Sequence, residues 1–234
     1  MLELEAKWFA KQVARLGARR VSPILNIGSS TRDYRATVQP WIEQHLWRPI
    51  TEQGATVFHM DVKRAPGVDI VGDLGDRGFL EYLSTMRFRC VFCNNLLEHV
   101  PNRQEVCDAV RMIAQDGAHL FVSCPHSYPY HLDPLDTMFR PGIEELAALF
   151  AGTEIHQAEI IRQNAHRRPL ALAWTLVRLC MPFYRPTRWA FMVRHNLSYL
   201  WKDFEATCVV LRARGGCGPT LEASEGGKAA GAKH

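Results

Sequence analysis

The chain has 234 residues, of which 47% are hydrophobic and 22% are charged, and it carries a formal net charge of +4 at pH 7. This length and composition suffice for one α/β domain with a full buried core, plus an insertion. This small net charge does not favour the hypothesis that the protein binds duplex nucleic acid. The amino terminus is charged and lacks the apolar core of a signal peptide, so a cytoplasmic protein is expected.

Seven cysteines, an odd number, are scattered along the chain, and most lie inside apolar runs. That distribution predicts reduced, buried thiols. Cys90 and Cys93 form a C-x-x-C pair, but on a strand they would point to opposite faces, and no second pair lies at zinc-ligand spacing. We therefore expect two packed thiols rather than a metal or redox centre.

In chain order, an amphipathic helix is expected first, over residues 2–16, with Leu4, Trp8, Val13 and Leu16 roughly on one side to cover the sheet or a cofactor. Further helices are predicted over residues 34–51, broken near Pro40 and Pro49, over 78–86, and over 101–115 up to a stop at Asp116-Gly117. Short apolar runs between them predict strands over residues 23–28, 55–60, 68–71, 88–93 and 118–124. Strands that alternate with helices indicate a parallel sheet covered on both faces.

Polar or glycine residues follow four of these strands: Gly28-Ser29-Ser30, Asp61, Gly72-Asp73 and Asn94-Asn95. In an open parallel sheet, ligands bind at the carboxyl ends of the strands, so these groups are candidates for a small-molecule site. A carboxylate such as Asp61 at the tip of the second strand can accept both hydroxyls of a ribose. Taken singly, each residue is also an ordinary turn residue.

Together these segments carry a resemblance to a known family. The residues concerned are Ile24-Leu-Asn-Ile-Gly28, Asp61, Gly72-Asp-Leu74, Asn94-Asn-Leu-Leu-Glu-His-Val-Pro101 and Gln115-Asp-Gly-Ala-His-Leu-Phe-Val122. In this order and spacing they resemble the class I S-adenosylmethionine-dependent methyltransferases, in their small "Leu-Glu-His-Val" branch, over about residues 20–150. The resemblance implies a Rossmann-like seven-stranded sheet, mostly parallel with one antiparallel edge strand, and helices on both faces.

The resemblance also implies S-adenosylmethionine as the cofactor and a set of contacts for it. The turn at Gly28, Ser29 and Ser30 would lie against the methionine part, Asp61 with its neighbour Val62 would hold the ribose, Asp73 with Leu74 would meet the adenine, and Asn94 with Asn95 would lie near the methionine amino group.

The chain departs from the family where Gly28-Ser-Ser30 stands in place of the usual Gly-x-Gly. A second glycine lets the backbone approach a pyrophosphate closely. S-adenosylmethionine has no phosphate, so a serine can be accommodated there, and the departure counts against NAD more than against the methyl donor. The gap from this turn to Asp61 is also longer than usual in the family, which leaves open how residues 29–35 contact the cofactor.

A loop rich in groups that bind or deprotonate a substrate follows the fifth strand, at residues 125–134, and Asp136 is expected to open the next helix. His126 and His131 are the candidate general bases, ranked above His99, whose motif recurs in the family whatever the acceptor. In the alternative reading, Tyr128 and Tyr130 pack and the histidines cap. His126, His131 and Asp133 could make three metal ligands, but no further group completes the set, so no metal is predicted.

Two last strands are expected over residues 154–161 and 205–213, with an insertion at about 165–200 between them. Its apolar run at 169–184 has arginine flanks and is too short and too charged for a confident membrane span, which leaves a lid, a homodimer face, or peripheral membrane contact through residues 167–188. The predicted organisation is a covering helix at 1–19, a methyltransferase domain at 20–214 and a flexible tail at 215–234.

The sequence thus predicts a methyltransferase that acts on an oxygen, or less favourably a nitrogen, of a small-molecule or glycan-like acceptor. Two alternatives remain open at this point. One is a catalytically silent module that binds an adenosyl compound, and the other is a scaffold at a membrane surface.

Overall fold

A computed structural model describes residues 1–131, 135–164 and 202–214. The insertion at about 165–200, with its lid, dimer and membrane interpretations, lies outside the described residues, as do the tail at 215–234 and Asp133. In the described part of the chain, no helix is long and apolar enough to cross a membrane.

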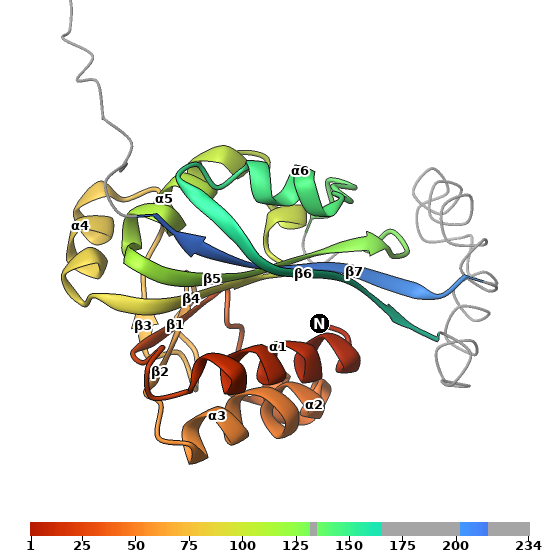
Figure 1. The fold of residues 1–234 in the computed structure, drawn as a ribbon, viewed down its shortest axis with the longest axis horizontal. Helices are drawn as coiled ribbons and strands as arrows, with labels where there is room; N and C mark the ends of the chain where they lie inside the picture. Colours follow the sequence, from red (N-terminus) through yellow and green to blue (C-terminus); the bar gives the residue numbers. More distant parts are fainter. Residues whose placement is uncertain (132–134, 165–201, 215–234) are drawn as a thin grey trace, which may run out of the picture.

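Seven strands form one sheet (Figure 1): β1 (Ile24–Ile27), β2 (Val57–Asp61), β3 (Ile70–Val71), β4 (Phe88–Asn94), β5 (Ala114–Ser127), β6 (Thr153–Gln163) and β7 (Phe204–Ala213). Their order in the sheet is β3-β2-β1-β4-β5-β7-β6. All pairs from β3 to β5 are parallel, whereas β7 is antiparallel to both of its neighbours. This confirms the predicted Rossmann-like sheet, and it places the single antiparallel strand one position in from the edge, which β6 forms.

Helices cover both faces of this sheet (Figure 1). On one face lie α1 (Glu3–Leu16), α2 (Pro40–Ile42) and α3 (Arg48–Glu52), and on the other lie α4 (Arg77–Thr85), α5 (Arg103–Ile113) and α6 (Ile143–Ala148). Two hydrophobic cores result, one on each face. Cys90 belongs to one core and Cys93 to the other, and both are free and buried, which confirms that they are packed thiols on opposite faces of β4.

An aromatic cluster fixes the α1 layer to the sheet. Phe92 of β4 and Phe121 of β5 stack with ring centroids 4.5 Å apart, and Phe9 of α1 lies 5.8 and 5.7 Å from them. Trp47 packs against Phe92 at 5.0 Å. Burial stabilises by roughly 1.5–3 kcal/mol for each side chain of this kind, so the cluster holds the N-terminal helices over the strands that carry the site.

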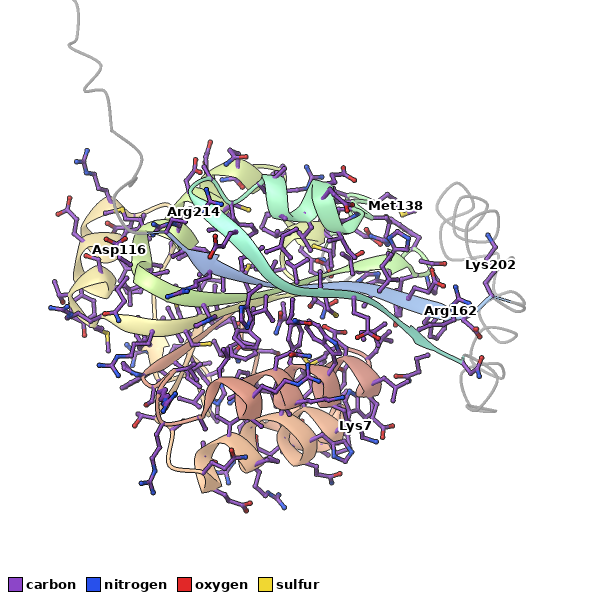
Figure 2. The ribbon with its side chains drawn as sticks, in the orientation of Figure 1. Lys7, Asp116, Met138, Arg162, Lys202 and Arg214 are labelled. Atoms are coloured by element: carbon purple, nitrogen blue, oxygen red, sulfur yellow. The ribbon has the colours of Figure 1, made fainter. Side chains whose placement is uncertain are left out.

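A group of polar contacts lies at the amino ends of the parallel strands. At the amino ends of the parallel strands, Arg111 of α5 donates from Nη2 to the carbonyl oxygen of Arg214 at 2.9 Å and lies 3.5 Å from the carboxylate of Asp116. Figure 2 shows Asp116 and Arg214 together at this end, and Met138 at the opposite end. These contacts join α5 to β5 and to the residue after β7, far from the carboxyl ends of the parallel strands.

Three sequence predictions about single elements are wrong. Leu4 is 43% exposed, so it does not belong to the buried side of α1. The helix at 34–51 breaks at Gln39, before Pro40. It continues through Pro49, because this proline follows the π-helical turn η2 (Glu43–Trp47) and lies in the first turn of α3, where a missing N–H is tolerated. Helix α5 ends at Ile113, and residues 114–117 already belong to β5.

His59 on β2 titrates below its usual range. Burial lowers the pKa of His59 to about 4, with Arg35 acting in the same direction and Asp69 opposing. Its Nδ1 lies 3.0 Å from Nδ2 of Asn26, an amide nitrogen that can only donate, so the contact requires an unprotonated Nδ1. The folded protein therefore resists a proton that the unfolded chain accepts at about pH 6.5.

Acidification from pH 7 to pH 4 is consequently expected to lower the free energy of unfolding by about 3 kcal/mol through His59. The stability is present above pH 6.5 and declines as the pH falls toward 4. Urea unfolding at the two pH values measures the loss. His59→Gln keeps an acceptor for Asn26 but cannot titrate, so it should lose correspondingly less, and an equal loss in both proteins would contradict this account.

Candidate functional site

A cavity of about 770 Å³ opens at the carboxyl ends of β1, β2 and β4. Small-molecule sites commonly measure ~300–1,000 Å³. The cavity is lined by every residue that the sequence analysis assigned to the cofactor, namely Gly28, Ser29, Ser30, Asp61, Val62, Asp73, Leu74, Asn94 and Asn95. Topology explains this convergence, because the ends of neighbouring parallel strands meet at one edge of the sheet.

The turn after β1 has a left-handed backbone at two positions. Gly28 has φ +67°, and a Cβ there would lie 3.3 Å from a methyl of Leu96, so the turn has little room for a side chain. Ser30 has φ +55°, which is uncommon for a residue other than glycine. Its amide donates to Oδ2 of Asp61 at 2.9 Å, and this bond links the ends of β1 and β2.

Arg35 supports this turn from behind and was missed in the sequence. Its side chain is buried, with Nη1 donating to the carbonyl oxygens of Ser29 at 2.9 Å and Ser30 at 2.8 Å, and Nη2 donating to Gly67 at 2.8 Å. Burial lowers the pKa of Arg35, although three nearby carboxylates oppose the shift. Arginines are common after turns, so the residues around Arg35 gave no sign that its side chain supports the site.

Asp61 has capacity left for a ligand. Its Oδ2 accepts from Ser30 and its Oδ1 accepts the amide of Lys63 at 3.1 Å. An ionised carboxylate has about four acceptor positions, so two backbone contacts leave room for two ligand hydroxyls. Asp73 is tied less firmly, because among the described residues its carboxylate accepts only the amide of Gly75, at Oδ1 and 2.9 Å.

Helix α1 contributes a buried carboxylate behind the cavity. Oε1 of Glu5 accepts from the hydroxyl of Ser123 at 2.6 Å and from Nδ2 of Asn95 at 2.8 Å. Asn95 has φ +50°, so this contact supports a strained residue at the end of β4. Among the described residues, nothing accepts a hydrogen bond from the buried Nδ2 of Asn94, which lines the cavity as a donor still without a partner.

The two candidate bases lie in different places. His131 lines the cavity, beside Tyr128 at a ring-centroid distance of 5.4 Å. His126 does not line it, and its Nδ1 instead lies 3.1 Å from the carbonyl oxygen of Pro141 and 3.2 Å from the hydroxyl of Thr207. Of these two histidines, only His131 is placed to contact a ligand in the cavity.

His131 rests on a buried ion pair. Nδ1 of His131 forms a hydrogen bond to the carbonyl oxygen of Pro129 at 3.3 Å and lies 3.1 Å from Oδ2 of Asp136. The Asp136 carboxylate accepts from Nη1 and Nη2 of Arg140 at 3.1 and 2.7 Å. Burial would raise the pKa of Asp136, but these bonds outweigh it and hold the pKa below its usual value. Burial also lowers the pKa of His131, with Asp136 opposing.

The prediction that Asp136 opens the next helix is wrong, because α6 begins at Ile143.

Glu98 and His99 belong to the short helix η3 (Leu97–His99). The ring of His99 lies beside the ring of His131. The carboxylate of Glu98 is fully buried, yet neither oxygen has a hydrogen-bond partner in the described part of the chain. Burial raises the pKa of Glu98 to about 8. Nδ1 of His99 contacts the carbonyl oxygen of Leu135, so the Leu-Glu-His-Val segment meets the chain that follows β5.

The sequence matches no protein-family model and no curated protein. Its fold resembles several solved structures. A protein assigned as a sarcosine dimethylglycine methyltransferase from Galdieria sulphuraria is 11% identical at a TM-score of 0.54, over 89% of this chain and 85% of that one. Coclaurine N-methyltransferase bound to N-methylheliamine and SAH is 11% identical at a TM-score of 0.50, over 86% and 70% of the respective chains.

The [4+2]-cyclase SpnF is similar to the same degree, with 15% identity and a TM-score of 0.51 over 88% of this chain and 81% of that one. At such identities the likeness shows the fold alone. The chain therefore has the fold of the class I S-adenosylmethionine-dependent methyltransferases.

Proposed function

We propose that this protein is an S-adenosylmethionine-dependent methyltransferase that methylates an oxygen, or less favourably a nitrogen, of a small-molecule or glycan-like acceptor. The observation that carries the proposal is the convergence of four separate segments, 28–30, 61–62, 73–74 and 94–95, on one cavity of a methyltransferase fold. When bound, the cofactor supplies an electrophilic methyl group on a sulfonium.

The residues present fit this cofactor. Asp61 retains acceptor capacity for two ribose hydroxyls. Nδ2 of Asn94 is a buried donor without a partner in the described residues, and a donor suits the cofactor's carboxylate better than its amino group. Ser30 occupies the position where a pyrophosphate would require glycine, which favours a ligand without phosphate.

At the acceptor end, His131 is the proposed proton acceptor. The lowered pKa of His131 keeps its ring neutral near pH 7. Its Nδ1 forms a hydrogen bond to the carbonyl oxygen of Pro129, which can only accept, so Nε2 is left with the lone pair. Methyl transfer to a hydroxyl requires removal of the hydroxyl proton as the acceptor oxygen attacks the methyl carbon. The loop would thus hold the acceptor in line and take its proton, and positioning would contribute most of the rate.

A nitrogen acceptor is the second possibility, because the two similar methyltransferases are named for amine substrates. A module that binds the cofactor without transferring methyl is the third, since the [4+2]-cyclase SpnF has the same fold. Methyl transfer from a ¹³C-labelled donor separates these cases, because the chemical shift of the product methyl distinguishes O-methyl from N-methyl, and a silent module gives no product.

Asp61→Ala tests the cofactor site. Loss of hydrogen bonds to a charged acceptor costs about 1–3 kcal/mol, so calorimetry should show S-adenosylmethionine binding ~5- to 150-fold more weakly. Asp33→Ala is the matched control, because Asp33 is an exposed acid outside the cavity. Unchanged affinity in Asp61→Ala would refute the ribose assignment, and NAD binding by the native protein would indicate an oxidoreductase.

A further inference from the structure

The acceptor side of the cavity contains a cluster of side chains that the proposed function leaves unexplained. We infer that Glu98, His99 and His131 bind a divalent transition-metal ion such as Zn²⁺ or Mn²⁺, which holds a hydroxylated acceptor for methyl transfer. The role of the ion rests on the proposed function, whereas the metal site itself depends on the three side chains alone.

The three side chains come from two segments and converge on the cavity. Glu98 and His99 belong to η3, and His131 belongs to the loop after β5, and all three line the cavity. One ligand atom from each lies within 4.8 Å of the others. The His99 and His131 rings are perpendicular with centroids 5.2 Å apart, and Nε2 of His99 lies 3.7 Å from Oε1 of Glu98. Small rotations of these side chains would bring the three atoms to coordination distance.

Both imidazoles are oriented as metal ligands are. Nδ1 of His131 forms a hydrogen bond to the carbonyl oxygen of Pro129 at 3.3 Å and lies 3.1 Å from Oδ2 of Asp136, and Nδ1 of His99 contacts the carbonyl oxygen of Leu135. A hydrogen at each Nδ1 satisfies these oxygens and leaves the lone pair on Nε2. A ligating histidine almost always donates its other ring N–H to a carboxylate or a backbone carbonyl in this way.

Glu98 supplies an independent argument, because its side chain is buried without a hydrogen-bond partner. Its side chain has 0% relative exposure, and neither oxygen accepts a hydrogen bond from any residue that the structure describes. Leaving a buried polar group unpaired is costly, and such a group in a folded protein calls for an explanation such as an ion. A cation in the cavity between Glu98 and the two histidines would provide the missing partner.

The donor set selects the kind of cation. Two imidazole nitrogens with one carboxylate oxygen suit first-row transition metals such as Zn²⁺ or Mn²⁺ better than Ca²⁺ or Mg²⁺, which prefer oxygen ligands. Three protein ligands leave further coordination positions open. Because the ligands line the cavity, those positions are available to an acceptor that presents a hydroxyl, alone or beside a second oxygen.

Coordination would change what His131 does. Its Nε2 would bind the ion, and the ion would lower the pKa of the acceptor hydroxyl, which releases its proton to solvent. The acceptor oxygen then forms a bond to the methyl carbon while the bond from that carbon to sulfur breaks, and the electron pair of the broken bond stays on sulfur to give S-adenosylhomocysteine. Atoms and charge balance without an oxidant or a reductant.

The test titrates Zn²⁺, and separately Mn²⁺, into the metal-stripped full-length protein by calorimetry, without cofactor or acceptor. We expect one equivalent to bind, and Glu98→Gln and His131→Asn each to weaken binding by about 100-fold or more, above the ~10- to 100-fold typical of losing an outer-shell partner. Absorption of the Co²⁺-loaded protein in the visible region reports nitrogen ligation independently. His156→Asn is the matched control, because His156 is an exposed histidine of β6 outside the cavity.

Failure to bind either ion stoichiometrically, or binding that survives both substitutions, would overturn the inference. Circular dichroism shows whether each variant is folded. If one of the two variants is unfolded, the other still tests the inference. S-adenosylmethionine binding is measured on the same samples. If the cofactor binds and the metal does not, only this inference fails, and if the metal binds and the cofactor does not, only the proposed function fails.

Discussion

Replacing His131 with alanine is expected to lower the single-turnover rate of methyl transfer by about 10²- to 10⁴-fold, the range for loss of a general base. His131 lines the cavity, its Nδ1 faces Asp136, and its lowered pKa leaves the ring neutral at pH 7. The measurement is formation of S-adenosylhomocysteine at saturating cofactor, with a hydroxylated acceptor found by screening. A metal ion bound at Nε2 would occupy the lone pair that a base needs, so parent and variant are both measured after metal stripping, where only the loss of the base lowers the rate.

His126→Ala is the comparison for this experiment. His126 lies outside the cavity, with Nδ1 near the carbonyl oxygen of Pro141, so its removal should change the rate by less than about 10-fold, below the range for a lost base. A large loss in His126→Ala, with His131→Ala near the parent rate, would reverse the assignment. If both variants stay near the parent, the loop contributes shape and the reaction needs no histidine.

Replacing Asp136 with alanine is expected to lower the free energy of unfolding by about 3–5 kcal/mol, the loss for a buried ion pair that loses one partner. The Asp136 carboxylate is fully buried and receives two bonds from the guanidinium of Arg140, which is 13% exposed. It also accepts the amides of His131 and Met138. Without it, the charge of Arg140 stays buried and the loop that carries His131 loses its anchor.

Urea unfolding at pH 7 measures this loss, and Glu154→Ala provides the comparison. Glu154 pairs with Arg214 at 3.3 Å, but both side chains are about half exposed or more, at 47% and 65%, so the substitution should cost no more than about 1 kcal/mol. Equal losses in the two variants would show that Asp136 stabilises the protein no more than a surface charge does.

Glu98 and Asp136 show why the sequence analysis found the cofactor side of the cavity more completely than the acceptor side. The proposed cofactor side is built from residues at the carboxyl ends of strands, such as Asp61 and Asn94, and a strand can be recognised from its own few residues. At the acceptor side, the contact between Asp136 and His131 and the approach of His99 to Leu135 depend on how a loop folds back over η3. Apolar periodicity carries no information about such contacts.

The sequence by itself determined the alternation of strands and helices, because each apolar run of period two or 3.6 is a local property. It also determined the polar strand ends, since the topology that the pattern implies brings them to one edge. Only the tertiary structure decided that Glu5 of α1 supports Asn95 and that Arg35 supports the turn at Ser29. Only the tertiary structure excluded His126 from the cavity and brought Glu98, His99 and His131 together, because residues distant in sequence meet through packing that no local pattern encodes.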